Sequence, residues 1–308
     1  MIRLDRLTKF FGRQIAVNGL SFEVPEGRIF GFIGPNGAGK TTTMRMLATL
    51  SQPSAGQGAV GGFNIRTQQM DVRRIMGYMP DHFGVYPGMR VGEYLDFFGA
   101  AYRLPLAKRK AIIKDVLSLT DLEQKRDDFV DTLSQGNKQR VCLAKTLIHD
   151  PKILILDEPA SGLDPRARIE LRELLKTLRS MGKTILISSH ILSDLADFSD
   201  LIGIIERGQL VVTGGVQEVA KKYRPQRVLE WRFLSGGDRA RSVFEKLPAV
   251  QKAELDGEIL RVEGQFNDEE LAQFHSEVVG HGARVLSCRE IEANLEDVFM
   301  RLTSGGVS

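Results

Sequence analysis

The chain has 308 residues, of which 42% are hydrophobic and 26% charged, a composition typical of a globular protein with about two domains. Its formal net charge of +3 is too small to indicate a nucleic-acid partner, and its two cysteines, Cys142 and Cys288, predict neither a disulfide framework nor a metal cluster. No apolar run approaches the roughly 18 residues of a membrane-spanning helix, and residues 1–5 lack the apolar stretch of a secretory signal. We therefore expect a reducing compartment, and a membrane role only through a partner.

The N-terminal part of the chain is predicted to form short antiparallel strands, followed by strands and helices. Residues 1–33 alternate apolar and polar side chains between turns. Beyond them we expect a strand, a helix, a second strand and a helical stretch, at residues 59–65, 67–74, 75–79 and 91–129. The last of these is typical of an all-helical insert.

Two continuous apolar runs, Ile153–Leu156 and Thr184–Ile187, are typical of parallel strands that are covered on both faces. Residues 166–180 between them have the pattern of a helix. These features predict a mainly parallel α/β sheet.

The pattern changes near residue 225. The pattern predicts a strand at 228–234 and a helix at 238–247, then strands at 250–255 and 258–262. A helix at 268–280 and a strand at 283–288 follow. This βαββαβ order is that of a ferredoxin-like α+β domain, which a helix at 295–302 would close. We therefore predict two domains, residues 1–222 with a helical subdomain at about 90–150, and residues 226–308.

A glycine-rich loop lies between the apolar run that ends at Ile33 and a helix-forming segment. Glycines let successive backbone N–H groups point inward, and the following helix adds its positive end, so the loop predicts a polyphosphate site. Lys40 would lie against the β- and γ-phosphates, and the Thr41 hydroxyl would complete the shell of a bridging Mg²⁺. A glycine-rich surface turn is the alternative, but it leaves Lys40 unexplained. The predicted phosphate-binding residues are Gly34, Pro35, Asn36, Gly37, Ala38, Gly39, Lys40, Thr41 and Thr42.

Asp157 and Glu158 follow the Ile153–Leu156 run, at the edge where open α/β sheets bind their ligands. Asp157 could hold the Mg²⁺ directly or through water. Glu158 points elsewhere and could orient and deprotonate the attacking water. An acidic strand end in solvent is the alternative interpretation.

Ser134 is a candidate N-cap for a second helix start with anion-binding capacity, and a simple cap is the alternative. The order of motifs over about residues 1–220 then resembles the nucleotide-binding subunit of ATP-binding cassette (ABC) transporters. These motifs are the glycine loop, Leu133–Asn137, Asp157–Pro159, Ser161–Pro165 and Ser188–His190.

The resemblance implies a head-to-tail homodimer in which Ser134 and Gly136 of one subunit close over ATP held by the Lys40 loop of the other. It also implies that His190 contacts the γ-phosphate and the attacking water, and that Asp164 acts across the dimer seam. Phe11 stands where the family stacks an aromatic ring on adenine; a core position in a strand is the alternative for it, and we expect its neighbour Phe10 to be the core residue.

Two residues depart from the family's pattern. Asp81 replaces the usual glutamine after the strand at 75–79, and its shorter, charged side chain would bind Mg²⁺ more strongly yet reach it less well. Gln135 places a bulkier side chain between Ser134 and Gly136. Both departures bear on turnover more than on ATP binding.

The resemblance implies an ATPase subunit that uses ATP and Mg²⁺ to power a separate membrane permease from the cytoplasmic face of the membrane. Residues 81–103 would pass the motion to the permease. The extension after residue 225 resembles that of drug, polysaccharide and ion exporter subunits, which favours export. Two alternatives stay open: a soluble cassette ATPase not coupled to a membrane, which the single cassette and the weak positive charge disfavour, and a regulatory module with little hydrolysis, which Asp81 and Gln135 allow.

Overall fold

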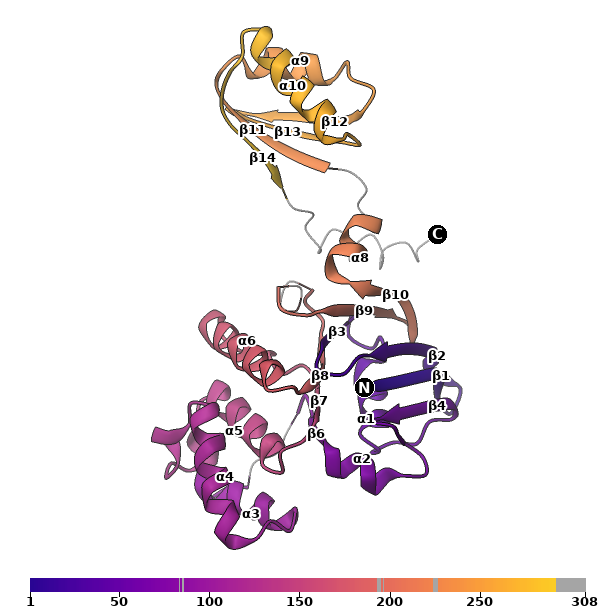
Figure 1. Cartoon of the computed structure of the whole chain (residues 1–308), viewed down its shortest axis with the longest axis vertical. Coiled ribbons are helices and arrows are strands. Elements are labelled where there is room, and N and C mark those ends of the chain that lie inside the picture. The colour runs from indigo at the N-terminus through magenta and orange to yellow at the C-terminus, as the bar shows by residue number, and fades with distance from the viewer. Residues whose placement is uncertain (83, 85, 193–194, 196, 224–226, 292–308) are drawn as a thin grey trace. The chain divides into compact units, whose positions relative to one another are not determined.

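The computed structural model describes residues 1–82, 84, 86–192, 195, 197–223 and 227–291. It divides into two compact units, Met1–Val216 and Gln217–Ser308 (Figure 1). No helix in the described ranges is both long enough and apolar enough to cross a bilayer.

A six-stranded, mainly parallel sheet forms the centre of the first unit. Its strand order is β10-β9-β3-β8-β7-β6, and only β10 runs antiparallel to its neighbour. Every residue of β3, β7 and β8 is buried, which confirms the prediction from the continuous apolar runs of β7 and β8. The expectation that residues 1–33 form only antiparallel strands is wrong for β3, which pairs in parallel with β8 and β9. The strands are β3 (Ile29–Ile33), β6 (Met76–Met79), β7 (Ile153–Leu156), β8 (Thr184–Ser189), β9 (Leu201–Glu206) and β10 (Gln209–Gly215).

An antiparallel sheet of order β2-β1-β4-β5 makes a second layer. Its strands are β1 (Ile2–Phe11), β2 (Gln14–Val24), β4 (Ala55–Val60) and β5 (Phe63–Asn64). Helix α1 (Lys40–Leu47) packs between the two sheets, because Met44 and Leu47 share one core cluster with residues of both. Helix α2 (Gln69–Ile75) leads from this layer into β6.

The expectation that Phe10 is a core residue is wrong. Its side chain is 46% exposed, and that of Phe11 is 55% exposed. The pairing of β1 with β2 shifts register between Lys9 and Phe10, and such an irregularity breaks the alternation of buried and exposed residues. Two consecutive rings therefore face solvent at the end of β1.

The helical insert is confirmed. It contains α3 (Val91–Ala101), α4 (Leu106–Leu119) and α5 (Gln135–Leu147), together with short 3-10 turns. Helix α5 begins at Ser134, whose side chain accepts a hydrogen bond from the Asn137 backbone N–H. Helix α6 (Pro165–Ser180) then connects β7 to β8.

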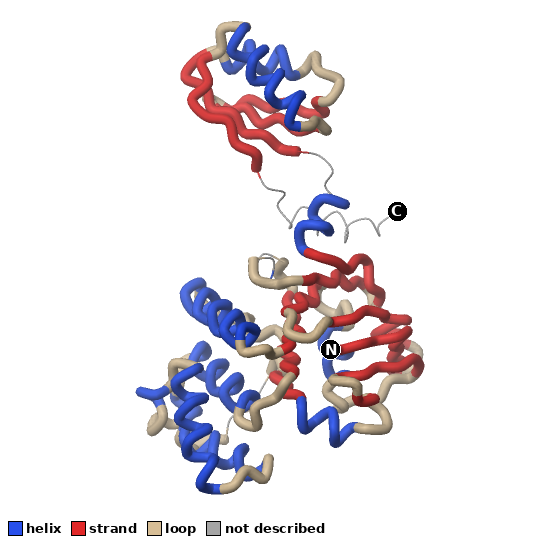
Figure 2. The backbone as a smooth tube through the Cα atoms, in the orientation of Figure 1, coloured by secondary structure: helices blue, strands red, loops and turns tan. Residues whose placement is uncertain are grey.

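The second unit has the predicted βαββαβ order. Its four antiparallel strands are ordered β12-β13-β11-β14, and α9 and α10 both cover one face of this sheet (Figure 2). The core between sheet and helices is built on Trp231, Phe244 and Phe274. The elements are α8 (Val216–Tyr223), β11 (Arg227–Ser235), α9 (Gly237–Phe244), β12 (Val250–Asp256), β13 (Ile259–Gly264), α10 (Asp268–Gly280) and β14 (Arg284–Ile291). The helix predicted at 295–302 lies outside the described residues.

Candidate functional site

The glycine loop joins the carboxyl end of β3 to the N-terminus of α1, as expected for a phosphate-binding loop. Two of its glycines are required by close backbone approaches. A Cβ atom at Gly34 would lie 2.3 Å from the Ile205 carbonyl oxygen, and one at Gly39 would lie 2.5 Å from that of Ala16. Gly39 also has a φ of 104°, a conformation that L-residues avoid. The surrounding backbone therefore holds the loop tightly.

We expect Gly39→Ala to destabilise the first unit by about 2–4 kcal/mol, because the methyl group adds steric overlap to an unfavourable φ. Gly37 is the matched control, because its φ is 80° but a Cβ there would meet nothing within 4 Å. Gly37→Ala should lower the free energy of unfolding by only the contribution of the unfavourable φ, about 1–2 kcal/mol. Urea unfolding of the two variants measures the difference, and equal losses of stability would contradict the proposed overlap.

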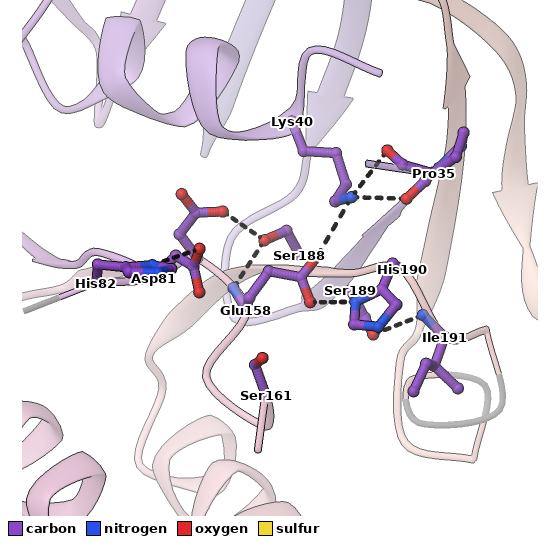
Figure 3. A network of polar contacts seen from close by, with 12 residues as sticks. Pro35, Lys40, Asp81, His82, Glu158, Ser161, Ser188, Ser189, His190 and Ile191 are labelled. Carbon is purple, nitrogen blue, oxygen red and sulfur yellow. Dashed lines mark hydrogen bonds and ion pairs between the residues drawn. The ribbon is translucent and has the colours of Figure 1, made fainter. Parts of the chain in front are cut away.

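Lys40 is 5% exposed at the start of α1, and its ammonium group lies in the bend of the loop. Its Nζ donates to the carbonyl oxygens of Gly34 at 2.6 Å and Pro35 at 3.3 Å. The same atom is 3.2 Å from Oε1 of Glu158, at the end of the neighbouring strand β7 (Figure 3). The loop cation and the acidic strand end thus meet.

Asp157 and Glu158 are held by one buried hydroxyl, that of Ser188 on β8. Ser188 Oγ donates to Asp157 Oδ1 at 2.8 Å and accepts from the Glu158 backbone N–H at 2.9 Å (Figure 3). Glu158 has a φ of 49°, a left-handed conformation that costs energy in an L-residue. The sequence motif Ser188–His190 does not reveal this role of Ser188, for which the signal in the sequence is a serine at the end of an apolar run.

The Glu158 carboxylate lies between two basic groups. Its Oε1 faces Lys40, and its Oε2 is 2.9 Å from Nδ1 of His190. The Glu158 side chain is 11% exposed, whereas that of His190 is 42% exposed. The carboxylate is therefore oriented from both sides, at a place that solvent reaches next to the imidazole.

The residues at the end of β7 fit a magnesium ion. Asp157 is fully buried, and its Oδ2 has no hydrogen-bond partner among the described residues. Burial raises the pKa of Asp157, and the hydroxyls of Ser188 and Thr41 partly offset that effect. An unsatisfied carboxylate oxygen near a threonine hydroxyl is the hard oxygen donor set that Mg²⁺ prefers.

The other predicted site residues lie at different places. Ser134 caps α5, and Asp164 caps α6 by accepting from the Ala167 backbone N–H at 2.9 Å. Asp81 Oδ2 is 2.8 Å from His82 Nδ1, and its charge contributes to the raised pKa of Asp157. Phe11 is an exposed ring with the Lys9 ammonium 5.0 Å from its centroid. Among the described residues, none of Ser134, Asp164 and Phe11 bonds to Lys40, Asp157, Glu158 or His190.

The chain is similar to known proteins over most of its length. A family model described as ABC transporter matches residues 17–161. The chain is 35% identical over 303 residues to Nod factor export ATP-binding protein I of Ralstonia nicotianae, covering 98% of this chain and 94% of that protein. A solved ATP-binding subunit of an ABC transporter matches with a TM-score of 0.66 at 27% identity, over 72% of this chain and 93% of that chain. CbiO1 of Clostridium perfringens, described as part of the ABC transporter complex cbiONQ, matches with a TM-score of 0.65 at 26% identity, over 80% and 95% of the two chains.

Proposed function

Because the chain belongs to the ABC transporter family, as an ATP-binding subunit of the ATP-hydrolysing type, we propose that it powers a separate membrane permease in the direction of export. The name of the Ralstonia relative supports export, and the CbiO1 description supports assembly with other subunits. The protein would then lie at the cytoplasmic face of the membrane. The observation that carries the catalytic part of this proposal is the Glu158 carboxylate held between Lys40 and His190.

In the proposed reaction, water attacks the γ-phosphorus and Glu158 accepts the proton of that water, while the bond to the β,γ-bridging oxygen breaks and ADP leaves with that oxygen. His190 would orient the water and the phosphate, and its contact with Glu158 holds the two groups together. Lys40 would neutralise the β- and γ-phosphates as a point charge. Thr41 and Asp157 would hold the magnesium ion, which reduces the charge repulsion between phosphate and nucleophile. Asp81 is the third proposed metal ligand.

The dimer is proposed because one chain carries two helix starts that suit anions. The start of α1 holds Lys40, and the start of α5 exposes Ser134. Among the described residues, no bond joins Ser134 to Lys40 within one chain. A head-to-tail pair would place Ser134 and Gly136 over the partner's ATP. Asp164 would act at the same seam, and the exposed Phe11 ring would stack on adenine.

The proposed permease surface lies between residues 81 and 103. Tyr86 and Phe97 are 50% and 47% exposed, and their ring centroids are 5.6 Å apart. Tyr86 also contacts the buried Tyr94 of α3, which anchors the pair on the helix. Adjacent exposed aromatic rings are typical of the centre of a protein interface.

We expect a multi-spanning membrane protein to co-purify with the chain from its native membranes. Phe97→Asp should reduce the recovered amount by about tenfold or more, because it places a charge in an apolar interface centre. Met70→Asp is the control, since Met70 is 63% exposed on α2, outside this surface. Membrane extraction followed by mass spectrometry measures the partner.

Each alternative has its own outcome when ATP binding and phosphate release are measured beside the membrane extraction. Phosphate release without any membrane partner would support the soluble cassette ATPase. ATP binding without phosphate release, by the isolated chain or with its partner, would support the regulatory module.

A further inference from the structure

A buried glutamine joins helix α5 to the loop that follows Glu158. Gln139 lies in the second turn of α5 and is 5% exposed. Its Nε2 donates to the Ser161 carbonyl oxygen at 2.9 Å. The Ser161 backbone N–H in turn donates to the Glu158 carbonyl oxygen at 3.0 Å, and Figure 3 places Ser161 on the loop beyond Glu158. A short polar path therefore runs from the proposed catalytic base to α5.

The loop meets α5 beside a cavity. A cavity of about 380 Å³ lies between α5 and α6, and Gly136, Gln139, Pro159 and Leu163 are among the residues that line it. Leu163 of the loop lies close to α5, because a Cβ atom at Gly136 would be 3.6 Å from Leu163 Cδ2. The Gln139 hydrogen bond adds to this packing a directional contact between the helix and the loop.

The neighbouring Arg140 has a different role. It pairs with Glu170 in the second turn of α6, and with Asp121 at 3.0 Å. These contacts connect α5 to the body of α6 and to the end of α4, not to the loop at 158–164. The Gln139 bond is thus the polar link, among the described contacts of α5, that reaches this loop.

We propose that Gln139 couples the two nucleotide sites of the dimer. The inference rests on the proposed function, in which Glu158 serves the protomer's own ATP and Ser134 covers the partner's ATP. ATP at the first site positions Glu158 and the loop that follows it. Gln139 then moves α5 together with this loop. The helix start at Ser134 thereby raises the affinity of the partner's site for ATP. Because coupling is reciprocal, ATP at the second site favours binding at the first by the same factor.

Gln139→Met in the full-length chain tests this role, because methionine keeps the length and helix propensity of glutamine but donates no hydrogen bond. Gln124→Met is the matched control, since Gln124 is exposed on the 3-10 turn Glu123–Lys125. ATP binding and phosphate release are measured against ATP concentration. In the wild type, we expect the first ATP to raise the affinity for the second about fivefold or more, with a Hill coefficient above one.

In Gln139→Met we expect this ratio to fall and the Hill coefficient to move toward one, because only the coupling that dimer closure provides by itself remains, while affinity for the first ATP stays as in the wild type. Gln124→Met should retain the wild-type ratio. A purely structural role for Gln139 would lower the unfolding temperature or the maximal rate and leave the Hill coefficient unchanged. If Gln139→Met fails to fold, Gln139→Asn removes the same bond, because its shorter amide cannot reach the Ser161 carbonyl.

Two results would overturn the inference, and they are distinguishable. A cooperative wild type with an equally cooperative, folded Gln139 variant would reject the coupling role and leave the dimer mechanism in place. A monomeric, non-cooperative wild type in saturating ATP would reject the dimer of the proposed function, and with it the coupling.

Discussion

Replacing Glu158 with glutamine is expected to lower the rate of phosphate release by about 10²- to 10⁴-fold, the usual contribution of a general base. The amide keeps the shape of the side chain, and its oxygen can still face the Lys40 ammonium, but it cannot take a proton from water. ATP affinity should be retained or improved, because a negative charge beside the triphosphate is removed. ATP-dependent dimers should therefore accumulate.

The measurements are phosphate release, calorimetry with MgATP and size-exclusion chromatography with ATP. Glu173→Gln is the matched control, since Glu173 is exposed on α6, in an ion pair with Lys176. Equal turnover in wild type and Glu158→Gln would remove Glu158 from the mechanism. Loss of ATP binding in the same variant would assign Glu158 to the binding site instead.

Lys40→Met is expected to weaken MgATP binding by roughly 30- to 1000-fold, the loss of about 2–4 kcal/mol from charge-assisted hydrogen bonds to phosphate. The substitution has a second effect in the same direction. It leaves the Glu158 carboxylate, which is 11% exposed, without the cation that lies 3.2 Å away. An unpaired carboxylate in a largely buried site repels the incoming phosphates.

A double-mutant cycle separates the two effects. Calorimetry on Lys40→Met, Glu158→Gln and the double variant should show that removing the Glu158 charge restores part of the affinity lost with Lys40. Lys176→Met and Glu173→Gln form the control cycle, because this exposed pair has a similar N–O distance of 2.9 Å. Unchanged MgATP affinity in Lys40→Met would reject the loop as the nucleotide site.

Several features of the fold were predictable because they depend on local sequence. The continuous apolar runs of β7 and β8, the glycine loop before α1 and the βαββαβ order after residue 226 all match the structure. Each signal depends on residues that are close along the chain: a run of apolar side chains, glycines that allow a bend, or a change from period two to period 3.6. The predicted role of His190 at the γ-phosphate, by contrast, depends only on the resemblance to the family.

Other features required the tertiary structure. The exposure of Phe10 depends on a register shift between β1 and β2, which alternation within one strand does not reveal. The bridge from Ser188 to Asp157 and Glu158 depends on β7 and β8 being parallel neighbours, with Leu156 opposite Ile187. The Gln139 bond to Ser161 similarly joins a helix and a loop that are distant along the chain.

Propensity, periodicity and backbone conformation are local properties, so the amino-acid sequence is sufficient to predict most of the helices and strands and the residue types that can bind a phosphate and a metal ion. Which of those residues meet depends on the packing of the whole fold. Strand order and helix packing bring Lys40, Glu158 and His190 into contact from three separate segments. Such contacts arise from burial of the whole core, so no single stretch of sequence encodes them.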